Sequence, residues 1–478
     1  MNKMHMSDAD RASADRGANR DAVFFPIGYM SADQRRAAGK ALRAAAPRSA
    51  HAGWKPPEDR RDPISLLHQS NDGRLPQLIP VRFARMAESP FAFFRGAAAI
   101  MAADLATTPT SGIRVQACGD AHVMNFGAFS TPERNIFFDI NDFDETLPAP
   151  WEWDVKRLIT SIIIAARHLC FHDSDAAKAA ADTVRSYREH MADYASMRAL
   201  GVWYDHIDLD RLLQALTSAR EVERVKLRVE EARKKSTPEI LFPKLVERSG
   251  AWLKIKDEPP LIFHPTEEEA PGQKTGYAHA LEGYRNSLPG HVRTLFDNFH
   301  LFDLAIKVVG VGSVGTYCAI GLFMAADDDP IFLQIKEARP SVLEPYAGKS
   351  PYPNDGERVV AGQRLMQSAS DIFLGWTRGI NERDYYFRQL RDTKLSGIID
   401  DWDATTLREH GKLCAWALAK AHARSGDRAM IAGYLGPSAA FDDAVCEFAV
   451  DYADQNIRDY RAFIKAIHDG RIQVASEA

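Results

Sequence analysis

Cysteine is scarce in this chain, and the few cysteines stand far apart. The 478 residues include five of them: Cys118, Cys170, Cys318, Cys414 and Cys446. No two of them form a C-x-x-C pair, which argues against a zinc site and against a disulfide framework. A reducing compartment therefore fits this composition best.

Long apolar runs and an excess of basic charge are also lacking. The longest apolar stretch, residues 158–170, is too short to span a bilayer and contains Arg167. Residues 1–21 are polar and do not have the apolar core of a signal peptide. A net charge of −5 leaves no sequence-wide basic field for nucleic acid or an acidic membrane. We therefore expect a cytoplasmic protein with neither nucleic acid nor a membrane as partner.

The chain is too long for one compact core, so two or three domains or lobes are expected. Hydrophobic periodicity predicts helices over residues 63–105 and 151–246, and short strands between these two blocks. Residues 250–275 are rich in Pro and Glu and predict a loop. Strands are expected again over residues 305–337, and residues 357–376 favour a helix.

Acidic residues are concentrated in residues 118–158, which hold eight carboxylates. Asp139, Asp142, Asp144 and Glu145 crowd the end of a predicted strand with few cations beside them. Such a cluster is costly unless a cation neutralises it, and Mg²⁺ takes oxygen ligands of this kind and is usually shared with phosphate. The structural alternative is a solvated acidic turn. Asp139, Asp142 and Asp144 all remain open as the metal-binding residue.

The segment GDAHVMN, residues 119–125, brings Asp120 and Asn125 together after a β-rich run. Phosphoryl transfer needs an aspartate that accepts the proton of the acceptor hydroxyl, and an asparagine and a second aspartate that hold metal. Asp120, Asn125 and Asp142 supply these parts in order. We predict Asp120 as the catalytic base, with Asn125 and Asp142 as metal ligands. His122 and Asp144 are candidate supporting residues.

Three glycines, Gly310, Gly312 and Gly315, have the G-x-G-x-x-G spacing after an apolar run. A dinucleotide-binding domain needs a helix directly after the third glycine, whereas a kinase needs a strand there. The residues that follow, TYCAIGLF, favour a strand. The remaining interpretations are a dinucleotide site with Glu337 as the ribose acid, and a glycine hairpin without a ligand.

A strand with a lysine at its end, DDPIFLQIKEA, follows the glycine segment and carries Lys336. Its position is similar to that of the lysine that contacts the α- and β-phosphates of ATP in kinases. We predict a nucleotide site formed by Lys336 and the glycine segment. The predicted nucleotide-binding residues are Gly310, Gly312, Ser313, Gly315 and Lys336.

These motifs resemble known kinases. GDAHVMN resembles the G-D-x-H-x-x-N of the aminoglycoside and choline kinase superfamily, and NDFD, residues 141–144, resembles its metal-binding D-F-x. WEWDVKRL, residues 151–158, resembles the helix that this family places next, in which Asp154 would brace the catalytic loop. Residues 407–427 resemble the helix that precedes the catalytic loop.

The order of the motifs is reversed, because Asp120 and Asp142 precede Gly310 and Lys336. The resemblance therefore implies a circularly permuted, two-lobed, protein-kinase-like α+β fold, with a large mainly helical lobe and a small β-rich lobe. Termini that lie together at the surface make such a permutation physically cheap. The expected divisions are a partly disordered N-terminal extension (1–62), a helical lobe with the catalytic and metal loops (63–300), a β-rich nucleotide lobe (301–400) and C-terminal helices that complete the large lobe (401–478).

Over most of its length the chain resembles a bacterial family, domain of unknown function 2252. The segments that carry this resemblance are SPFAFFRG, GDAHVMNFG, FDINDFDETLPAPWEWDVKRL, KVVGVGSVGTYC and GQRLMQSASDIFLGW. They span residues 89–376. The resemblance implies a kinase-like relationship and brings no known substrate.

One kinase part has no motif, namely the glutamate that pairs with the lysine. Glu357 is the best-placed candidate, Glu344 competes with it, and Gln363 and Gln367 favour the inward face of the same helix. The overall expectation is a phosphotransferase with Mg²⁺ as cofactor, ATP as co-substrate and an alcohol group of a small molecule as acceptor.

Other functions remain open. They are a non-catalytic nucleotide-binding regulator, adenylyl transfer to a protein, and a metallophosphoesterase. The last class also needs a D-x-H before GDAH and an N-H-D after it, and the chain has neither.

Overall fold

The computed structural model describes residues 30–235, 238–249, 252–259, 261–264, 273–308, 310, 312, 314–326, 329–379, 381–390 and 399–475. These residues form a mixed α+β fold in which helices predominate and the strands make several small sheets. The predicted α+β class is confirmed at this level. No helix in the described ranges is long and apolar enough to cross a membrane.

The helices before β9 are α2 (Ala32–Ala41), α3 (Pro63–Ser70), α4 (Ile79–Ala87), α5 (Pro90–Gly96), α6 (Ala98–Leu105), α7 (Trp151–His168), α8 (Asp173–Ser196), α9 (Ala199–Tyr204), α10 (Leu209–Ala215), α11 (Ala219–Lys235), α12 (Pro238–Leu245), α13 (Gln273–Ser287) and α14 (Gly290–Phe296). Those after β11 are α15 (Glu344–Ala347), α16 (Asp355–Met366), α17 (Ala404–Ser425), α18 (Arg428–Leu435) and α19 (Ala440–His468).

The strands are β1 (Arg114–Ala117), β2 (Phe126–Ser130), β3 (Ile136–Ile140), β4 (Leu147–Pro150), β5 (Ile207–Asp208), β6 (Val246–Ser249), β7 (Trp252–Ile255), β8 (Ile262–Phe263), β9 (His300–Lys307), β10 (Cys318–Met324), β11 (Pro330–Ala338), β12 (Gly375–Arg378) and β13 (Asp384–Gln389).

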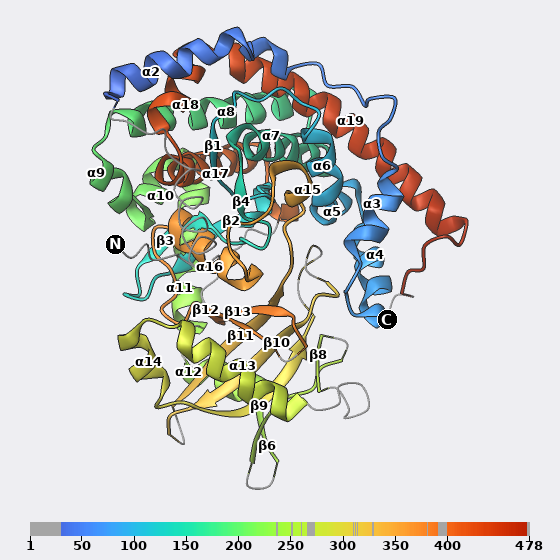
Figure 1. Ribbon diagram of the computed structural model, residues 1–478, viewed down its shortest axis with the longest axis vertical. Coiled ribbons are helices and arrows are strands. Elements are labelled where there is room, and N and C mark those ends of the chain that lie inside the picture. Colours follow the sequence, from blue (N-terminus) through green and yellow to red (C-terminus); the bar gives the residue numbers. More distant parts are fainter. Residues whose placement is uncertain are drawn as a thin grey trace, which may run out of the picture.

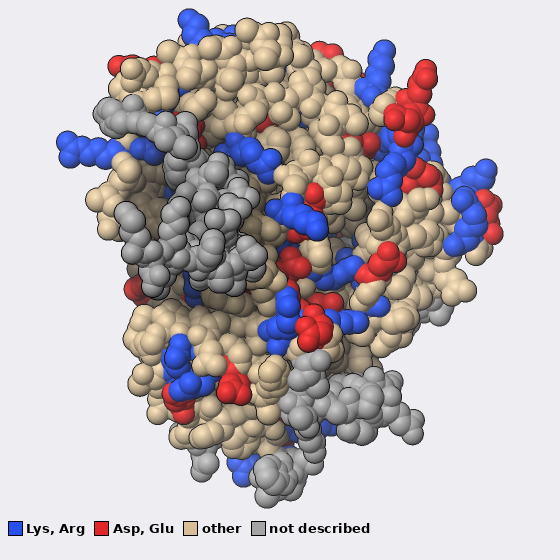
Figure 2. All heavy atoms as spheres, in the orientation of Figure 1, with Lys and Arg blue, Asp and Glu red and all other residues tan. Residues whose placement is uncertain are grey.

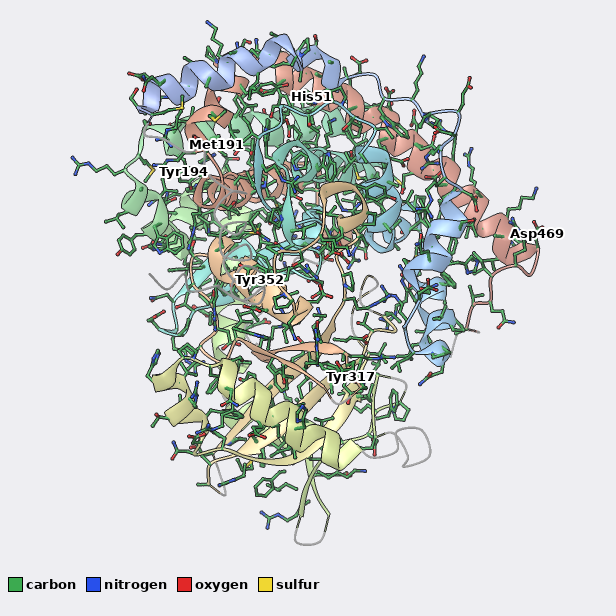
Figure 3. All side chains as sticks on the ribbon, viewed as in Figure 1. His51, Met191, Tyr194, Tyr317, Tyr352 and Asp469 are labelled. Carbon is green, nitrogen blue, oxygen red and sulfur yellow. The ribbon has the colours of Figure 1, made fainter. Side chains whose placement is uncertain are left out.

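Helix α7 is the centre of the helical part. Every residue from Trp151 to Ala166 is buried, because α5, α8, α17 and α19 all pack against this helix. A helix that is covered on all sides has no need of a polar face, which explains the long apolar run in its sequence. The side chains of this part, such as that of His51 below α2, fill the space between the helices (Figure 3).

The six-stranded sheet lies in the lower part of Figure 1 together with α12, α13 and α14, and has the strand order β12-β13-β11-β10-β9-β8. Neighbouring strands are antiparallel, and every residue of β10 is buried. One apolar cluster joins the sheet to α13 and α14, and a second joins it to β6 and β7. Burial on both faces gives β10 a continuous apolar sequence instead of an alternating one. Tyr317, just before β10, marks this part of the molecule in Figure 3.

Two of our sequence predictions need correction. Residues 250–275 were expected to form a loop, yet β7 and β8 lie there, and β8 pairs with β9. The predicted helix over 357–376 ends at Met366 and strand β12 follows. Strand β7 pairs with the neighbouring β6 and β12 with the neighbouring β13, whereas β8 pairs with β9 beyond two helices. Local composition does not report these pairings.

The boundary between the two parts also differs from our prediction of residue 300. Val246 and Ile262 pack with Ala305, and Tyr284 and Phe296 pack with Phe323. The chain from β6 to α14 therefore belongs with the six-stranded sheet.

Candidate functional site: a charged cavity between the helices and the six-stranded sheet

The turn after β1 is held from below by a buried carboxylate. Asp154 of α7 accepts hydrogen bonds from the backbone N–H groups of Cys118 (2.6 Å) and Gly119 (2.9 Å). His422 of α17 lies 3.2 Å from the same carboxylate. Gly119 has φ +82°, and a Cβ there would collide with the backbone oxygen of Glu145. Only glycine fits this turn. Asp154 fixes the position of the turn through its two hydrogen bonds to the backbone.

Asp120 follows this turn and lies against a buried arginine. Its Oδ1 accepts a hydrogen bond from Nε of Arg157 at 2.7 Å, and a second guanidinium nitrogen is also in ion-pair contact. Arg157 further donates to the backbone oxygen of Phe94 and stacks over its ring at 4.5 Å. His122 lies 3.8 Å from the other oxygen of Asp120. The sequence prediction missed Arg157, although its spacing from Asp154, i and i+3 on one helix, places both on the same face.

Asn125 links the loop that contains Asp120, between β1 and β2, to the acidic loop, residues 141–146, between β3 and β4. Its Nδ2 donates to the backbone oxygen of Asp120 at 2.7 Å, and its backbone oxygen accepts from the N–H of Asn141 at 2.8 Å. Asp142 follows Asn141 directly. Two residues predicted as metal ligands from sequence are thereby brought to one wall of the same cavity.

Lys336 of β11 lies at the acidic loop. Its Nζ is 2.5 Å from Oδ2 of Asp144, and the hydroxyl of Tyr386 donates to the other oxygen of Asp144 at 2.6 Å. Burial opposes ionisation of Asp144, but the ion pair with Lys336 lowers its pKa to about 2. The carboxylates of Asp142 and Asp144 outweigh burial at Lys336 and raise its pKa. Lys336 is therefore a buried cation that faces both aspartates.

Asp142 and Asn125 provide oxygen atoms that suit Mg²⁺. One oxygen of Asp142 accepts the N–H of Asp144 at 3.2 Å, and within the described ranges its other oxygen and the amide oxygen of Asn125 accept no hydrogen bond. Burial and the charge of Asp144 raise the pKa of Asp142, although Lys336 opposes this. A bound cation would offset that burial cost. Among the residues that the structure describes, no group of three or more His, Cys, Asp or Glu side chains could hold a metal ion. Oxygen atoms of a substrate would therefore have to complete the coordination shell of Mg²⁺.

Asp139, the third aspartate of the cluster, lies elsewhere. Its fully buried carboxylate forms an ion pair with Lys420 of α17 and accepts the backbone N–H of Ser368 at 3.0 Å. It does not line the cavity. The metal alternatives therefore reduce to Asp142 and Asp144, of which Asp144 is engaged by Lys336.

The glycine segment connects two antiparallel strands, β9 and β10. No helix follows Gly315, because β10 begins at Cys318. Gly310 and Gly312 line the cavity, whereas Gly315 has φ +89° and its backbone oxygen accepts the N–H of Leu75 at 2.7 Å. The predicted nucleotide residue Ser313 lies outside the described residues.

Arg74 holds the glycine segment from the helical part. Its guanidinium donates to the backbone oxygens of Gly312 at 3.0 Å and Val314 at 2.5 Å. Sequence reasoning missed this residue, because its motif-free position between α3 and α4 shows no sign of a partner 240 residues away.

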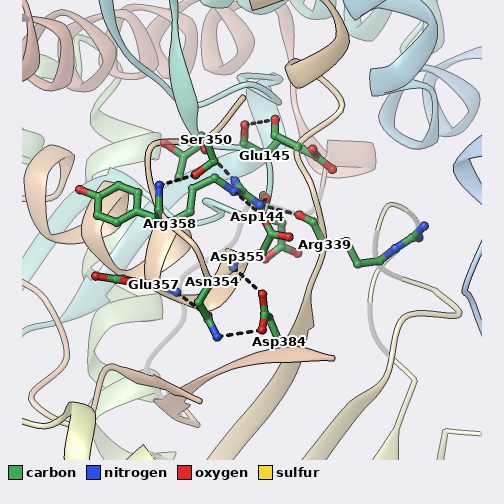
Figure 4. A network of polar contacts seen from close by, with 12 residues as sticks. Asp144, Glu145, Arg339, Ser350, Asn354, Asp355, Glu357, Arg358 and Asp384 are labelled. Carbon is green, nitrogen blue, oxygen red and sulfur yellow. Dashed lines mark hydrogen bonds and ion pairs between the residues drawn. The ribbon is translucent and has the colours of Figure 1, made fainter. Parts of the chain in front are cut away.

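Glu357, our best candidate for the partner of Lys336, does not line the cavity, whereas Glu344 does. Arg358, the residue after Glu357, is fully buried and donates to the backbone oxygens of Asp144, Thr146 and Arg339 at 2.6–3.0 Å (Figure 4). The same view shows Glu357 directed away from these bonds. Helix α16 therefore supports the acidic loop through an arginine. In the described structure the acid on Lys336 is Asp144.

Gln363 of α16 and Gln367, the residue directly after this helix, are buried, as their predicted inward positions require. Gln363 donates to Gln367 at 2.9 Å, and Gln367 donates to the backbone oxygen of Ile140. Both link α16 to the end of β3 next to the acidic loop.

A cavity of about 870 Å³ opens between the helical part and the six-stranded sheet. Figure 2 shows acidic and basic side chains gathered around a hollow between these two parts. The predicted residues that line this cavity are Asp120, His122, Asn125, Asp142, Asp144, Gly310, Gly312 and Lys336. The basic residues that line it and were not predicted are Arg61, Arg74, Arg82, Arg95, Lys307, Arg339 and Arg388.

Fold and site together define a mixed α+β protein with one large charged cavity, walled by a helical part and a six-stranded sheet. The chain belongs to the bacterial family DUF2252, described as uncharacterized proteins conserved in bacteria, whose profile matches residues 74–466. No curated protein and no solved structure matches the chain.

Proposed function

We propose that this protein is an ATP- and Mg²⁺-dependent phosphotransferase that acts on an alcohol group of a small molecule. Asp120 would accept the proton of that hydroxyl, and Asn125 and Asp142 would hold the metal. Lys336 and the glycine segment from Gly310 would contact the phosphates.

The observation that carries the proposal is convergence. Asp120, Asn125 and Asp142 line the same cavity as Gly310 and Lys336, although Gly310 comes 168 residues after Asp142 in the sequence. Each residue was selected from sequence for a role in one reaction. Independent motifs with merely structural roles have no reason to meet at one solvent-accessible space.

The fold that fits this site is a two-lobed kinase-like fold with permuted connectivity. The glycine segment and Lys336 come from the six-stranded sheet, and the predicted base and metal ligands come from the helical part. Helix α17 contacts Asp154, which holds the turn before Asp120, through His422. It also contacts Asp139 of β3 through Lys420. A cut in the chain before the base loop would leave α17 in that place.

A second candidate is a nucleotide-binding regulator without phosphoryl transfer. The observation that favours it is the ion pair of Asp120 with Arg157. The guanidinium occupies one oxygen of Asp120, so the carboxylate is engaged in a structural ion pair as well as being available to a substrate. Turnover of ATP therefore separates the two candidates, and nucleotide binding does not.

The first test is thermal stability with ATP, ADP or NAD, each with and without Mg²⁺. A ligand that binds only the folded protein raises its melting temperature. We expect stabilisation by ATP and ADP that depends on Mg²⁺, and none by NAD. Stabilisation by NAD alone would contradict the proposal.

The second test replaces the metal ligand. Asp142→Ala should abolish Mg²⁺-dependent ATP binding and leave the fold intact, because the carboxylate has one hydrogen bond, to the N–H of Asp144. Glu357→Gln removes an acid outside the cavity lining and is the matched control. Circular dichroism and the melting temperature check the fold of both variants. Binding of Mg-ATP by Asp142→Ala at the level of the parent would remove Asp142 from the site.

A further inference from the structure

Arg95 of α5 is a cation of the cavity wall without a counter-ion. It lines the cavity, and its side chain stands 6.0 Å from the ring of Phe91. Its Nε is buried without a hydrogen-bond partner, and in the described ranges no carboxylate lies within ion-pair distance of its guanidinium. Burial lowers the pKa of Arg95. Arg95 is half-buried, and a guanidinium that has lost much of its water without gaining a counter-ion is costly, so its place at a cavity indicates a ligand.

The nearby acids do not neutralise Arg95. Asp120 is the acid whose charge acts most strongly on Arg95, but its carboxylate already forms an ion pair with Arg157. Glu88 also acts on Arg95, and it is exposed, so solvent and salt screen its charge. Two guanidinium groups thus share one half-buried carboxylate, and a positive charge remains beside Asp120.

Helix α6 adds hydrogen-bond donors at the same place. It begins at Ala98, two residues after α5 ends, and its N-cap residue Ala97 provides no side-chain acceptor. Ala98 and Ala99 line the cavity. The first N–H groups of a helix have no partner within the helix and favour an anion.

We propose that Arg95 and the N-terminus of α6 bind the carboxylate or phosphate group of an anionic acceptor, whose hydroxyl group lies at Asp120. A guanidinium matches both kinds of oxyanion through paired hydrogen bonds. Assignment of the anion to the acceptor depends on the proposed phosphotransferase function, whereas the anion site itself does not.

The charges that act on Arg95 differ from those that act on Lys336, the lysine of the predicted nucleotide site. The acids that act on Arg95 are Asp120 and Glu88, whereas those that act on Lys336 are Asp142 and Asp144. The glycine segment nevertheless comes close, since a Cβ at Gly312 would lie 3.7 Å from the backbone oxygen of Arg95. The terminal phosphate of ATP is therefore the rival occupant.

The anion site is tested by calorimetric titration of the full chain with inorganic phosphate and, separately, with malonate. Arg95→Met should weaken binding of the preferred anion by roughly 10- to 100-fold, the range for a lost charge-assisted hydrogen bond. Arg95→Lys should retain part of the binding. Arg61→Met removes the same charge from the cavity mouth and should change binding by less than about threefold. The stronger of the two anions identifies the class of acceptor.

The outcomes are distinct. No anion binding by the parent, or binding that Arg95→Met leaves unchanged while its melting temperature shows a folded protein, would overturn the anion site. Mg-ATP should bind Arg95→Met as it binds the parent. A loss of Mg-ATP affinity equal to the loss of phosphate affinity would assign Arg95 to the nucleotide and overturn the acceptor role. If the parent binds no Mg-ATP, the proposed function fails and the acceptor role with it, and the phosphate titration still decides the anion site.

Discussion

At the scale of single residues, the site consists of polar groups that are held in place by partners. Asp120 has Arg157, Lys336 has Asp144, and Asp154 holds the turn at Gly119. Buried charges of this kind are stable only when they are paired. The paired groups fix geometry, and our proposal assigns the metal to the oxygens of Asn125 and Asp142 that accept no hydrogen bond within the described ranges.

Asp120 is the residue that separates an enzyme from a regulator. Asp120→Asn keeps an oxygen that accepts from Arg157 and removes the base. We expect almost unchanged Mg-ATP affinity and a turnover lower by roughly 10²- to 10⁴-fold, the usual effect of a lost general base. ATP consumption with a panel of amino alcohols, sugars, hydroxy acids and protein acceptors measures this. A parent protein that binds Mg-ATP and consumes none with any acceptor would favour the regulator.

We expect Lys156 of α7 to make the stability of the protein depend on pH. Its Nζ is buried without a hydrogen bond, 4.8 Å from the ring centre of Phe448, and burial lowers its pKa from 10.5 to about 7 although Glu152 opposes this. Between these two values the unfolded chain binds more protons than the folded chain, so stability rises with pH through that window. Below pH 7 the burial cost is present in full.

Lys156→Met removes this cost. We expect the free energy of unfolding to increase by up to about 5 kcal/mol at pH 6 and by about 2 kcal/mol at pH 9. Urea unfolding at both pH values measures the difference. Lys178→Met, on the exposed surface of α8, is the control and should change stability little at either pH. An equal gain for Lys156→Met at pH 6 and pH 9 would show that its pKa is not lowered.

At the scale of elements, the connection between α3 and α4 positions the glycine segment. Arg74 and Leu75 form hydrogen bonds to three backbone oxygens of that segment. We expect Arg74→Met to weaken Mg-ATP binding by about 10-fold, because the segment must then be ordered on binding. Arg61→Met is again the control. Unchanged affinity in Arg74→Met, measured by titration calorimetry, would separate the glycine segment from the nucleotide.

At the scale of the whole molecule, buried ion pairs connect distant parts of the sequence. Asp139 of β3 and Lys420 of α17 are 281 residues apart and fully buried. Lys420→Met leaves the buried carboxylate with backbone N–H donors but without a cation, and should cost about 3 to 5 kcal/mol of stability. The double variant Asp139→Asn/Lys420→Met should recover part of that loss. A double-mutant cycle from urea unfolding measures the coupling, and strictly additive losses would contradict it.

Several features of this protein were determined by local sequence alone. The residues after Gly315 favour a strand by their own propensities, and β10 begins there. Gly119 and Asp154 could be recognised from motifs, because a turn and a helix start are local structures. The alternation of periodicities indicated blocks of helix and strand for the same reason, whereas the α+β class was implied by the resemblance of the motifs.

Other features were decided only by tertiary structure. The sequence around Lys336 does not show that Lys336 pairs with Asp144, and the sequence around Asp139 does not show that Asp139 pairs with Lys420. Glu357 was predicted as the partner of Lys336, but in the structure Arg358, not Glu357, is the residue of α16 that contacts the acidic loop. Arg95 lies among buried aromatic residues in a helical segment, and only the cavity shows that its charge has no partner. Pairings of this kind depend on how elements far apart in the chain pack, and on the direction of each side chain within them, which local propensity does not encode.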